Sequence, residues 1–230
     1  MHKVPSGFDS VAEAIESRRS VRGFLDKPVD PALIERLLAL AGRAPSGSNI
    51  QPWKLHVLTG PALARLTGAL TAAHFRGEPE AREYEYYPTR WREPYLGRRR
   101  EIGWRLYELA GVARGDHKGS LRQRGRNYAF FGAPVGLVFT IDKDLEQGSW
   151  LDYGMFLQTL MIAARGAGLD TCLQAAIASY PAIVRREVGI PEDETIVCGM
   201  ALGYADPDEP TNALRAERAP VSAYTTVHRD

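Results

Sequence analysis

Two apolar stretches decide the fold: Ala-Pro-Val-Gly-Leu-Val-Phe-Thr-Ile at residues 133–141 and Thr-Ile-Val-Cys-Gly-Met-Ala-Leu at residues 195–202. Such nearly unbroken runs are typical of strands that are buried on both faces of a sheet. Between them, residues 150–166 are apolar nearly all round, which predicts a helix buried on most of its faces. Together these segments predict an α+β sandwich with one mixed central sheet flanked by helices.

Weaker signals add further elements on both sides of this core. Asp30 and Pro31 start a predicted helix at 31–41, and Gly42 can end it. Residues 54–58 alternate like a strand, and residues 10–18 have helical spacing with Ser10 as the expected N-cap. Other predicted elements are helices at 61–73, 98–110, 119–129 and 180–188, followed by an extended arm from Tyr204.

Length and composition limit the possible classes of protein. The chain has 230 residues, of which 44% are hydrophobic and 25% charged, which suits a single domain over residues 1–230. Within it, residues 78–126 form an excursion that is rich in Arg, Tyr and Trp. The 29 Lys and Arg nearly cancel the 28 Asp and Glu, which argues against a nucleic-acid coat protein, although a local basic patch stays possible.

The sequence also argues against secretion and membrane insertion. Residues 1–7 lack the apolar core of a signal peptide, and no apolar run approaches the roughly 20 residues that span a bilayer. Cys172 and Cys198 are too few for a disulfide framework and lack the spacing of a zinc site. We therefore expect a cytoplasmic protein with two buried thiols, bound to neither membrane nor nucleic acid.

Common catalytic and nucleotide-binding motifs are absent. The sequence has no GxxxxGK[ST] loop, no GxGxxG after a strand, and no GxSxG or HExxH motif. The five His show no metal-ligand spacing, and no set of nucleophile, base and orienting group stands out. We therefore predict no metal and no catalytic side chain; if the protein is an enzyme, a cofactor supplies the chemistry.

Four segments point to an anionic, aromatic cofactor. Ser-Arg-Arg-Ser-Val-Arg-Gly-Phe at 17–24 can clamp a phosphate, although it can also be a solvated helix end. The loop at 44–53, Ala-Pro-Ser-Gly-Ser-Asn-Ile-Gln-Pro-Trp, offers amides and hydroxyls to a ligand or is a tight polar turn, with Trp53 packed at the next strand. Small residues at 175 and 176 allow a flat ring to approach the backbone, and Arg215 and Arg218 add possible phosphate contacts.

These segments, in this order and spacing, resemble the nitroreductase family of FMN-dependent oxidoreductases over roughly residues 10–225. The resemblance implies an intertwined homodimer with FMN at the subunit interface and the helix at 150–166 in the dimer core. Carried over by position, Arg18, Arg19, Ser20, Arg22 and Arg218 hold the cofactor's phosphate end. Pro45, Ser46, Gly47, Ser48, Asn49 and Gln51 reach the flavin from the partner subunit, and Leu173, Gln174 and Ala175 lie along its ring.

The resemblance also implies an activity. Electrons pass from NADH or NADPH through flavin N5 to a small, electron-poor aromatic acceptor, such as a nitroaromatic or a quinone, in a ping-pong cycle. The excursion is expected to cover the open face of the flavin, or to be a flap whose aromatics pack on the body. Alternatives are a same-fold flavin reductase, reductive dehalogenase or flavin-consuming enzyme, a flavin-storing or redox-sensing protein, and a nucleic-acid binding module that uses the excursion.

Overall fold

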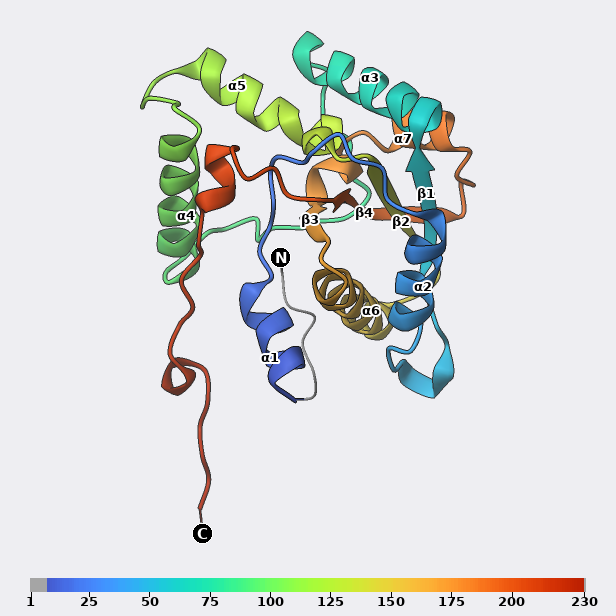
Figure 1. Ribbon diagram of the computed structural model, residues 1–230, viewed down its shortest axis with the longest axis vertical. Helices are drawn as coiled ribbons and strands as arrows, with labels where there is room; N and C mark the ends of the chain where they lie inside the picture. Colours follow the sequence, from blue (N-terminus) through green and yellow to red (C-terminus); the bar gives the residue numbers. More distant parts are fainter. Residues whose placement is uncertain (1–7, 230) are drawn as a thin grey trace.

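The computed structural model describes residues 8–229 and contains a four-stranded antiparallel sheet between two layers of helices (Figure 1). The expectation about residues 1–7 lies outside the described residues. The strand order is β1-β2-β4-β3. A parallel bridge between Ser20 and Thr171 extends the sheet at the outer edge of β3. The strands are β1 at Lys54–Thr59, β2 at Val135–Asp142, β3 at Asp170–Gln174 and β4 at Glu194–Gly203.

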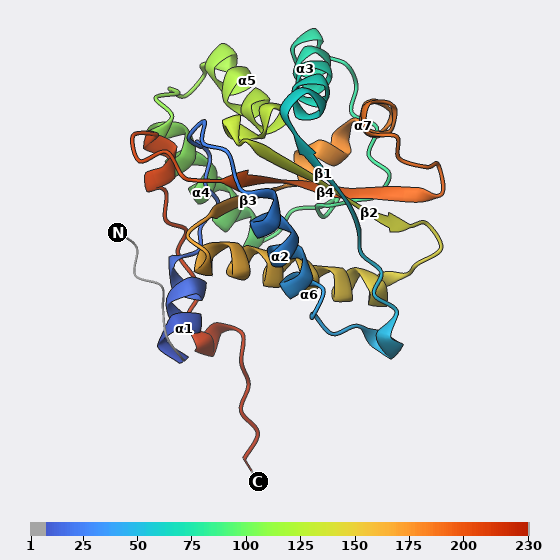
Figure 2. The ribbon, with the colours of Figure 1, turned by 45° about the vertical axis from the view of Figure 1, so that its right-hand side comes forward.

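The two central strands are buried because helices cover both faces of the sheet. Leu137 and Phe139 of β2 pack into the core formed with α2 (Pro31–Ala41) and α6 (Gln147–Gly166). The intervening Val138 enters the opposite core, formed with α3 (Gly60–Arg76) and α7 (Pro181–Val188). α1 (Phe8–Ser17) packs against α6 on the first face (Figures 1 and 2). The α+β sandwich predicted from the apolar runs is confirmed. The sheet differs from the mixed one that was predicted, because all four strands pair antiparallel and the parallel pairing is limited to the bridge between Ser20 and Thr171.

Most predicted elements are present, and Asp30 caps α2 by accepting from the N–H of Ala32 at 2.9 Å. The N-cap prediction at Ser10 is wrong, because α1 begins at Phe8 and Ser10 lies in its first turn. β3 was not predicted, since its Asp-Thr-Cys-Leu-Gln sequence has no clear apolar pattern and becomes a strand by pairing with β4. α6 is covered by the sheet, α1 and α2, but its remaining side is open, where Leu151 is 71% exposed.

The excursion forms two helices that lie beside and above the sheet, α4 (Tyr95–Leu109) and α5 (His117–Gly125). The helix predicted at 119–129 ends earlier than expected. A 3-10 segment, η2 (Arg126–Gly132), follows α5, and Phe130 and Phe131 adopt φ values of 48° and 55° there. Both rings are buried in the core, which holds this turn in place. No helix within residues 8–229 is both long and apolar enough to span a membrane.

Candidate functional site: an arginine-lined cavity

The arginine segment is held in place by the edge of the sheet. It leaves α1 and runs along β3, where the N–H of Val21 donates to the carbonyl of Thr171 at 3.0 Å. The Val21 side chain is fully buried and anchors the segment. Around it, a cavity of about 390 Å³ opens between this segment, Ile102 of α4 and the start of the C-terminal arm. The structure thus brings together six residues that the sequence named as possible phosphate contacts: Arg18, Arg19, Ser20, Arg22, Arg215 and Arg218.

The cavity concentrates positive charge. The pKa of Arg18 is lowered, first by burial and then by the charge of Arg218. The pKa of Arg19 is also lowered by burial and by Arg215, although Asp170 acts in the opposite direction. Asp170 is shared, since it lies 3.5 Å from Arg165 Nη1. Guanidinium groups that repel one another around a cavity are stabilised by an anion placed between them.

An unpartnered donor supports the same conclusion. The Nε atom of Arg19 is buried and has no hydrogen-bond partner among the described residues. Buried donors are rarely left unpaired in folded proteins, and a phosphate oxygen is a suitable acceptor for a guanidinium N–H. The residues lining this cavity therefore fit the phosphate end of a cofactor such as FMN.

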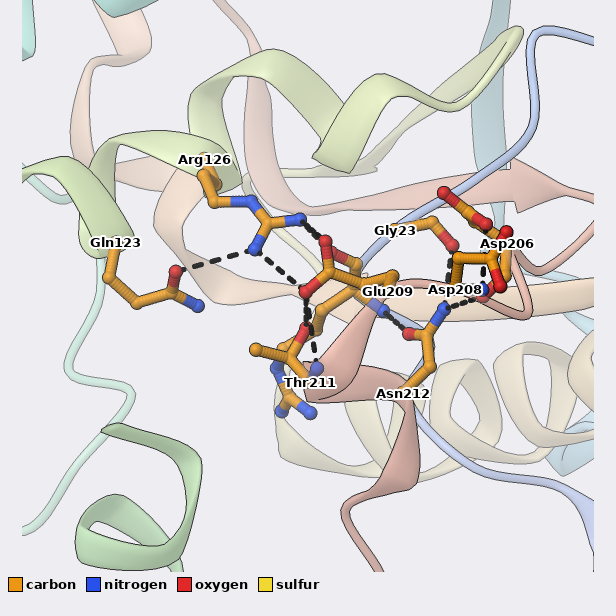
Figure 3. A network of polar contacts seen from close by, with 9 residues as sticks. Gly23, Gln123, Arg126, Asp206, Asp208, Glu209, Thr211 and Asn212 are labelled. Carbon is orange, nitrogen blue, oxygen red and sulfur yellow. Dashed lines mark hydrogen bonds and ion pairs between the residues drawn. The ribbon is translucent and has the colours of Figure 1, made fainter. Parts of the chain in front are cut away.

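A polar network fixes the backbone at Arg22, and we call it the Arg126–Glu209 clamp (Figure 3). Arg126 donates to both carboxylate oxygens of Glu209, at 2.7 and 3.2 Å, and to the carbonyl of Arg22 at 2.5 Å. The N–H of Arg22 donates to Asn212 Oδ1 at 2.7 Å. Both peptide groups of Arg22 are therefore held by residues that are distant in sequence. Asn212 also accepts from Arg215 through its carbonyl at 2.9 Å, which ties a second cavity arginine to the clamp.

Gly23 is required by the close packing of the clamp. A Cβ atom at this position would lie 2.3 Å from Cγ of Glu209. The clamp residues Arg126, Glu209 and Asn212 were not found from the sequence. They are single polar residues within segments predicted as an excursion and an arm, and no local spacing marks them.

The loop at 45–51 lies elsewhere in the chain. Its 3-10 turn η1 (Gly47–Asn49) is fastened to α6, because the N–H of Gly47 donates to Asp152 Oδ2 at 3.0 Å. Ser48, Asn49 and Gln51 adopt φ values of 50°, 60° and 53°. Trp53 stacks on Phe156 with ring centroids 5.0 Å apart, which confirms its predicted packing role.

The loop and the arginine segment that follows α1 lie near opposite ends of α6 (Figure 2). None of the predicted loop residues lines the cavity: Pro45, Ser46, Gly47, Ser48, Asn49 and Gln51. Asp152 binds the loop near one end of the helix, while Arg165 at the other end donates to Ser17 Oγ at 2.9 Å. Thirteen residues of α-helix separate these two by roughly 20 Å. One chain therefore does not bring the two predicted segments together.

The third predicted segment lies at the end of β3. Leu173 is half-buried against the α6 side of the core. Gln174 Nε2 donates to the carbonyl of Asn127 at 2.6 Å, while its Oε1 atom is buried with no partner among the described residues. The carbonyl of Ala175 accepts from Arg82 at 3.4 Å. The bond from Nε2 fixes the side-chain amide of Gln174, and its Oε1 atom stays available to accept a hydrogen bond.

Fold and cavity together define an α+β protein whose arginine-lined cavity has the residues to fit an anionic group. The nitroreductase family model matches residues 15–204. A 4-nitrobenzoate reductase of Pseudomonas putida is 42% identical, covering 95% of this chain and 94% of the relative. A chloronitrobenzene nitroreductase of Comamonas testosteroni is also 42% identical, with 95% and 97% covered.

Similar solved structures are also nitroreductases. The FMN and NADPH-dependent nitroreductase NfnB from Sphigopyxis sp. strain HMH superposes with a TM-score of 0.92 at 37% identity, covering 96% of this chain and all of that one. The FMN-dependent NfnB from Mycobacterium smegmatis, solved with NADPH, also gives 0.92, at 32% identity and with 97% and 100% covered. The chain belongs to the nitroreductase family, which confirms the predicted resemblance.

Proposed function

We propose that this chain is an FMN-dependent oxidoreductase that uses NADPH or NADH to reduce nitroaromatic compounds. The observation that carries the proposal is the arginine cavity, with its mutually repelling cations and the unpartnered Nε of Arg19. Family membership and the nitroreductases among the relatives support the activity. Ping-pong order, quinone acceptors and a cytoplasmic location stay predictions, as does the single domain over residues 1–230.

Each part of the chain has a proposed task. Arg18, Arg19, Ser20, Arg22 and Arg218 hold the phosphate, and the Arg126–Glu209 clamp keeps the Arg22 backbone in position. Leu173, Gln174 and Ala175 line the ring, with Gln174 Oε1 as a hydrogen-bond acceptor for a ring N–H. Bound FMN supplies the two-electron chemistry that no side chain here provides. The protein's contribution is to bind, orient and exclude water.

We further propose a homodimer, because one chain leaves apolar surface uncovered. Leu151 of α6 and Tyr224 of the C-terminal arm are each 71% exposed, and Val11 and Ile15 of α1 are also exposed. The arm runs away from the body of the chain (Figure 1). A second copy that covers these residues can also bring its own 45–51 loop toward the first chain's cavity. Sedimentation or light scattering measures the mass directly, and a monomer at micromolar concentration would contradict this part of the proposal.

The visible spectrum of the purified protein tests the cofactor. We expect flavin absorption bands, and steady NADPH oxidation when nitrobenzene is added without consumption of FMN. Net loss of FMN during turnover would instead support a flavin-consuming enzyme. A colourless protein that cannot be reconstituted with FMN would contradict the proposal.

A further inference from the structure

The distribution of charge along the chain is strongly uneven. Residues 90–126, the larger part of the excursion, carry eleven Lys and Arg against four Asp and Glu. The rest of the chain carries eighteen against twenty-four. Of the eleven cations, only Arg105 and Arg126 form an ion pair with any residue between 8 and 229. The excursion is therefore a region of uncompensated positive charge on a nearly neutral protein.

Few nearby carboxylates pair with these cations: Glu101 and Glu217 pair with Arg105, and Glu209 pairs with Arg126. Glu93 and Asp116 accept from backbone N–H groups in the first turns of α4 and α5. The carboxylates at 78, 80 and 83 are paired with arginines outside residues 90–126. A solvated helix face usually mixes both signs, because like charges in neighbouring positions repel. Three consecutive arginines at 98–100 in α4 depart from that pattern and favour an anionic ligand.

The excursion also contacts residues of the proposed cofactor site. Near its start, Arg82 donates to the carbonyl of Ala175, and directly after its end the carbonyl of Asn127 accepts from Gln174. Both contacts are with residues proposed to line the flavin ring. Ile102 of α4 lines the arginine cavity. A second cavity of about 530 Å³ adjoins it along the C-terminal arm. Three arginines and two carboxylates line this second cavity: Arg98, Arg105, Arg218, Glu101 and Glu217.

One part of the basic surface combines charge with aromatic rings. The Arg99 guanidinium lies over Trp91 and Tyr87, 4.5 and 5.6 Å from the ring centroids. Trp91 and Tyr87 are themselves 5.5 Å apart. Rings beside an unpaired guanidinium can bind a flat molecule by stacking while the cation pairs with an anionic substituent.

We propose that the acceptor taken by this enzyme carries an anionic group, such as a carboxylate, on its aromatic ring, and that the arginine face of α4 around Arg98 and Arg99 selects for it. This inference rests on the proposed function and narrows its substrate class. It concerns a small aromatic anion, and binding of nucleic acid to the same surface is the competing outcome.

The test compares 4-nitrobenzoate with 4-nitrobenzamide, a neutral molecule of nearly the same shape. Binding to the oxidised holoenzyme is measured by tryptophan fluorescence, and reoxidation of the anaerobically reduced holoenzyme by stopped flow, each at low and high salt. The variant Arg98→Gln/Arg99→Gln is matched by Arg36→Gln/Arg65→Gln, which removes two exposed cations from α2 and α3.

We expect the α4 variant to weaken nitrobenzoate binding about fivefold at low salt, the size expected of two unit charges about 8 Å away in water. The amide should change less than twofold, the α2/α3 control should change neither, and high salt should remove most of the preference. Equal losses for acid and amide would overturn the inference, as would a preference that salt leaves unchanged. Retention on single-stranded DNA that the α4 variant abolishes, with an unchanged acid-to-amide ratio, would assign the surface to nucleic acid. Failure of both compounds to reoxidise the enzyme would overturn the proposed function as well.

Discussion

The Arg126–Glu209 clamp allows a test of how the arginine cavity keeps its shape. Arg126→Met removes the donors to Glu209 and to the Arg22 carbonyl. Glu209→Gln keeps the side-chain shape but removes the charge that orients Arg126. Neither substitution replaces a residue that lines the cavity. The two variants change the charge beside the cavity in opposite directions, because Arg126→Met removes a cation and Glu209→Gln removes an anion.

The expected loss of stability follows from the contacts. A hydrogen bond to a charged group contributes about 1.5–3 kcal/mol. Solvent screens part of this interaction, since the Arg126 and Glu209 side chains are 32% and 17% exposed. We expect each variant to lower the free energy of unfolding by about 2 kcal/mol. For a chain of this size, that corresponds to a fall in Tm of about 4–8 °C.

The effect on FMN binding separates positioning from charge. If the clamp acts by holding the Arg22 backbone, both variants weaken FMN binding, by about tenfold or 1.4 kcal/mol. If only charge matters, Arg126→Met weakens binding of the FMN phosphate and Glu209→Gln strengthens it. The measurement is a fluorescence titration of FMN with apoprotein at a temperature where each variant is fully folded. The control is Arg76→Met, which replaces an exposed arginine at the end of α3 that is paired with Glu78. FMN binding by Glu209→Gln that is as tight as in the wild type, or tighter, would refute the positioning role.

Four further outcomes are expected. Arg18→Ala should weaken FMN binding by roughly ten- to a hundredfold in a titration, with little loss of apoprotein Tm because Arg18 faces the like charge of Arg218; equal loss of both would return Arg18 to a structural role. Gly23→Ala should lower the urea-unfolding free energy by about 1–3 kcal/mol, and a stability like that of the wild type would show that Glu209 moves aside freely. Burial raises the pKa of the Cys172 and Cys198 thiols, so neither should react with a disulfide reagent at pH 8 until the protein is unfolded. Burial favours the neutral form of Glu209, but hydrogen bonds from Arg126 and Thr211 outweigh this and lower the pKa of Glu209 below its ordinary value. The stabilisation by Glu209 should therefore be full above the pKa of the unfolded chain and be lost as the pH falls through the lowered pKa of the folded state. The difference in stability between wild type and Glu209→Gln should accordingly close in acid.

The sequence-based predictions were accurate where an element is determined by residues close together in the sequence, and they failed where it depends on distant residues. The start of α2 was predictable because Asp30 and Pro31 act within one turn. β2 and β4 were predictable because burial on both faces demands continuous apolar side chains. β3 was not, since its register is imposed by β4. The Arg126–Glu209 clamp was also missed, because its partners come from segments 83 residues apart and each is an ordinary polar residue by itself.

The position of the 45–51 loop bears on how a complete site must be built. The loop and the arginine segment are each attached to the rest of the chain. The loop is held by Asp152, and the arginine segment is held by Val21 and the Arg126–Glu209 clamp. Bringing them together within one chain would require one of these attachments to break. Two copies that associate along the exposed side of α6 avoid this cost, because the loop end of one helix can then lie near the cavity end of the other. The arrangement also covers Leu151, which one chain leaves exposed to water. Burial of this apolar side and completion of the cofactor site are therefore expected to occur in the same association step. Leu151→Glu should then both shift the protein toward monomer and lower its affinity for FMN.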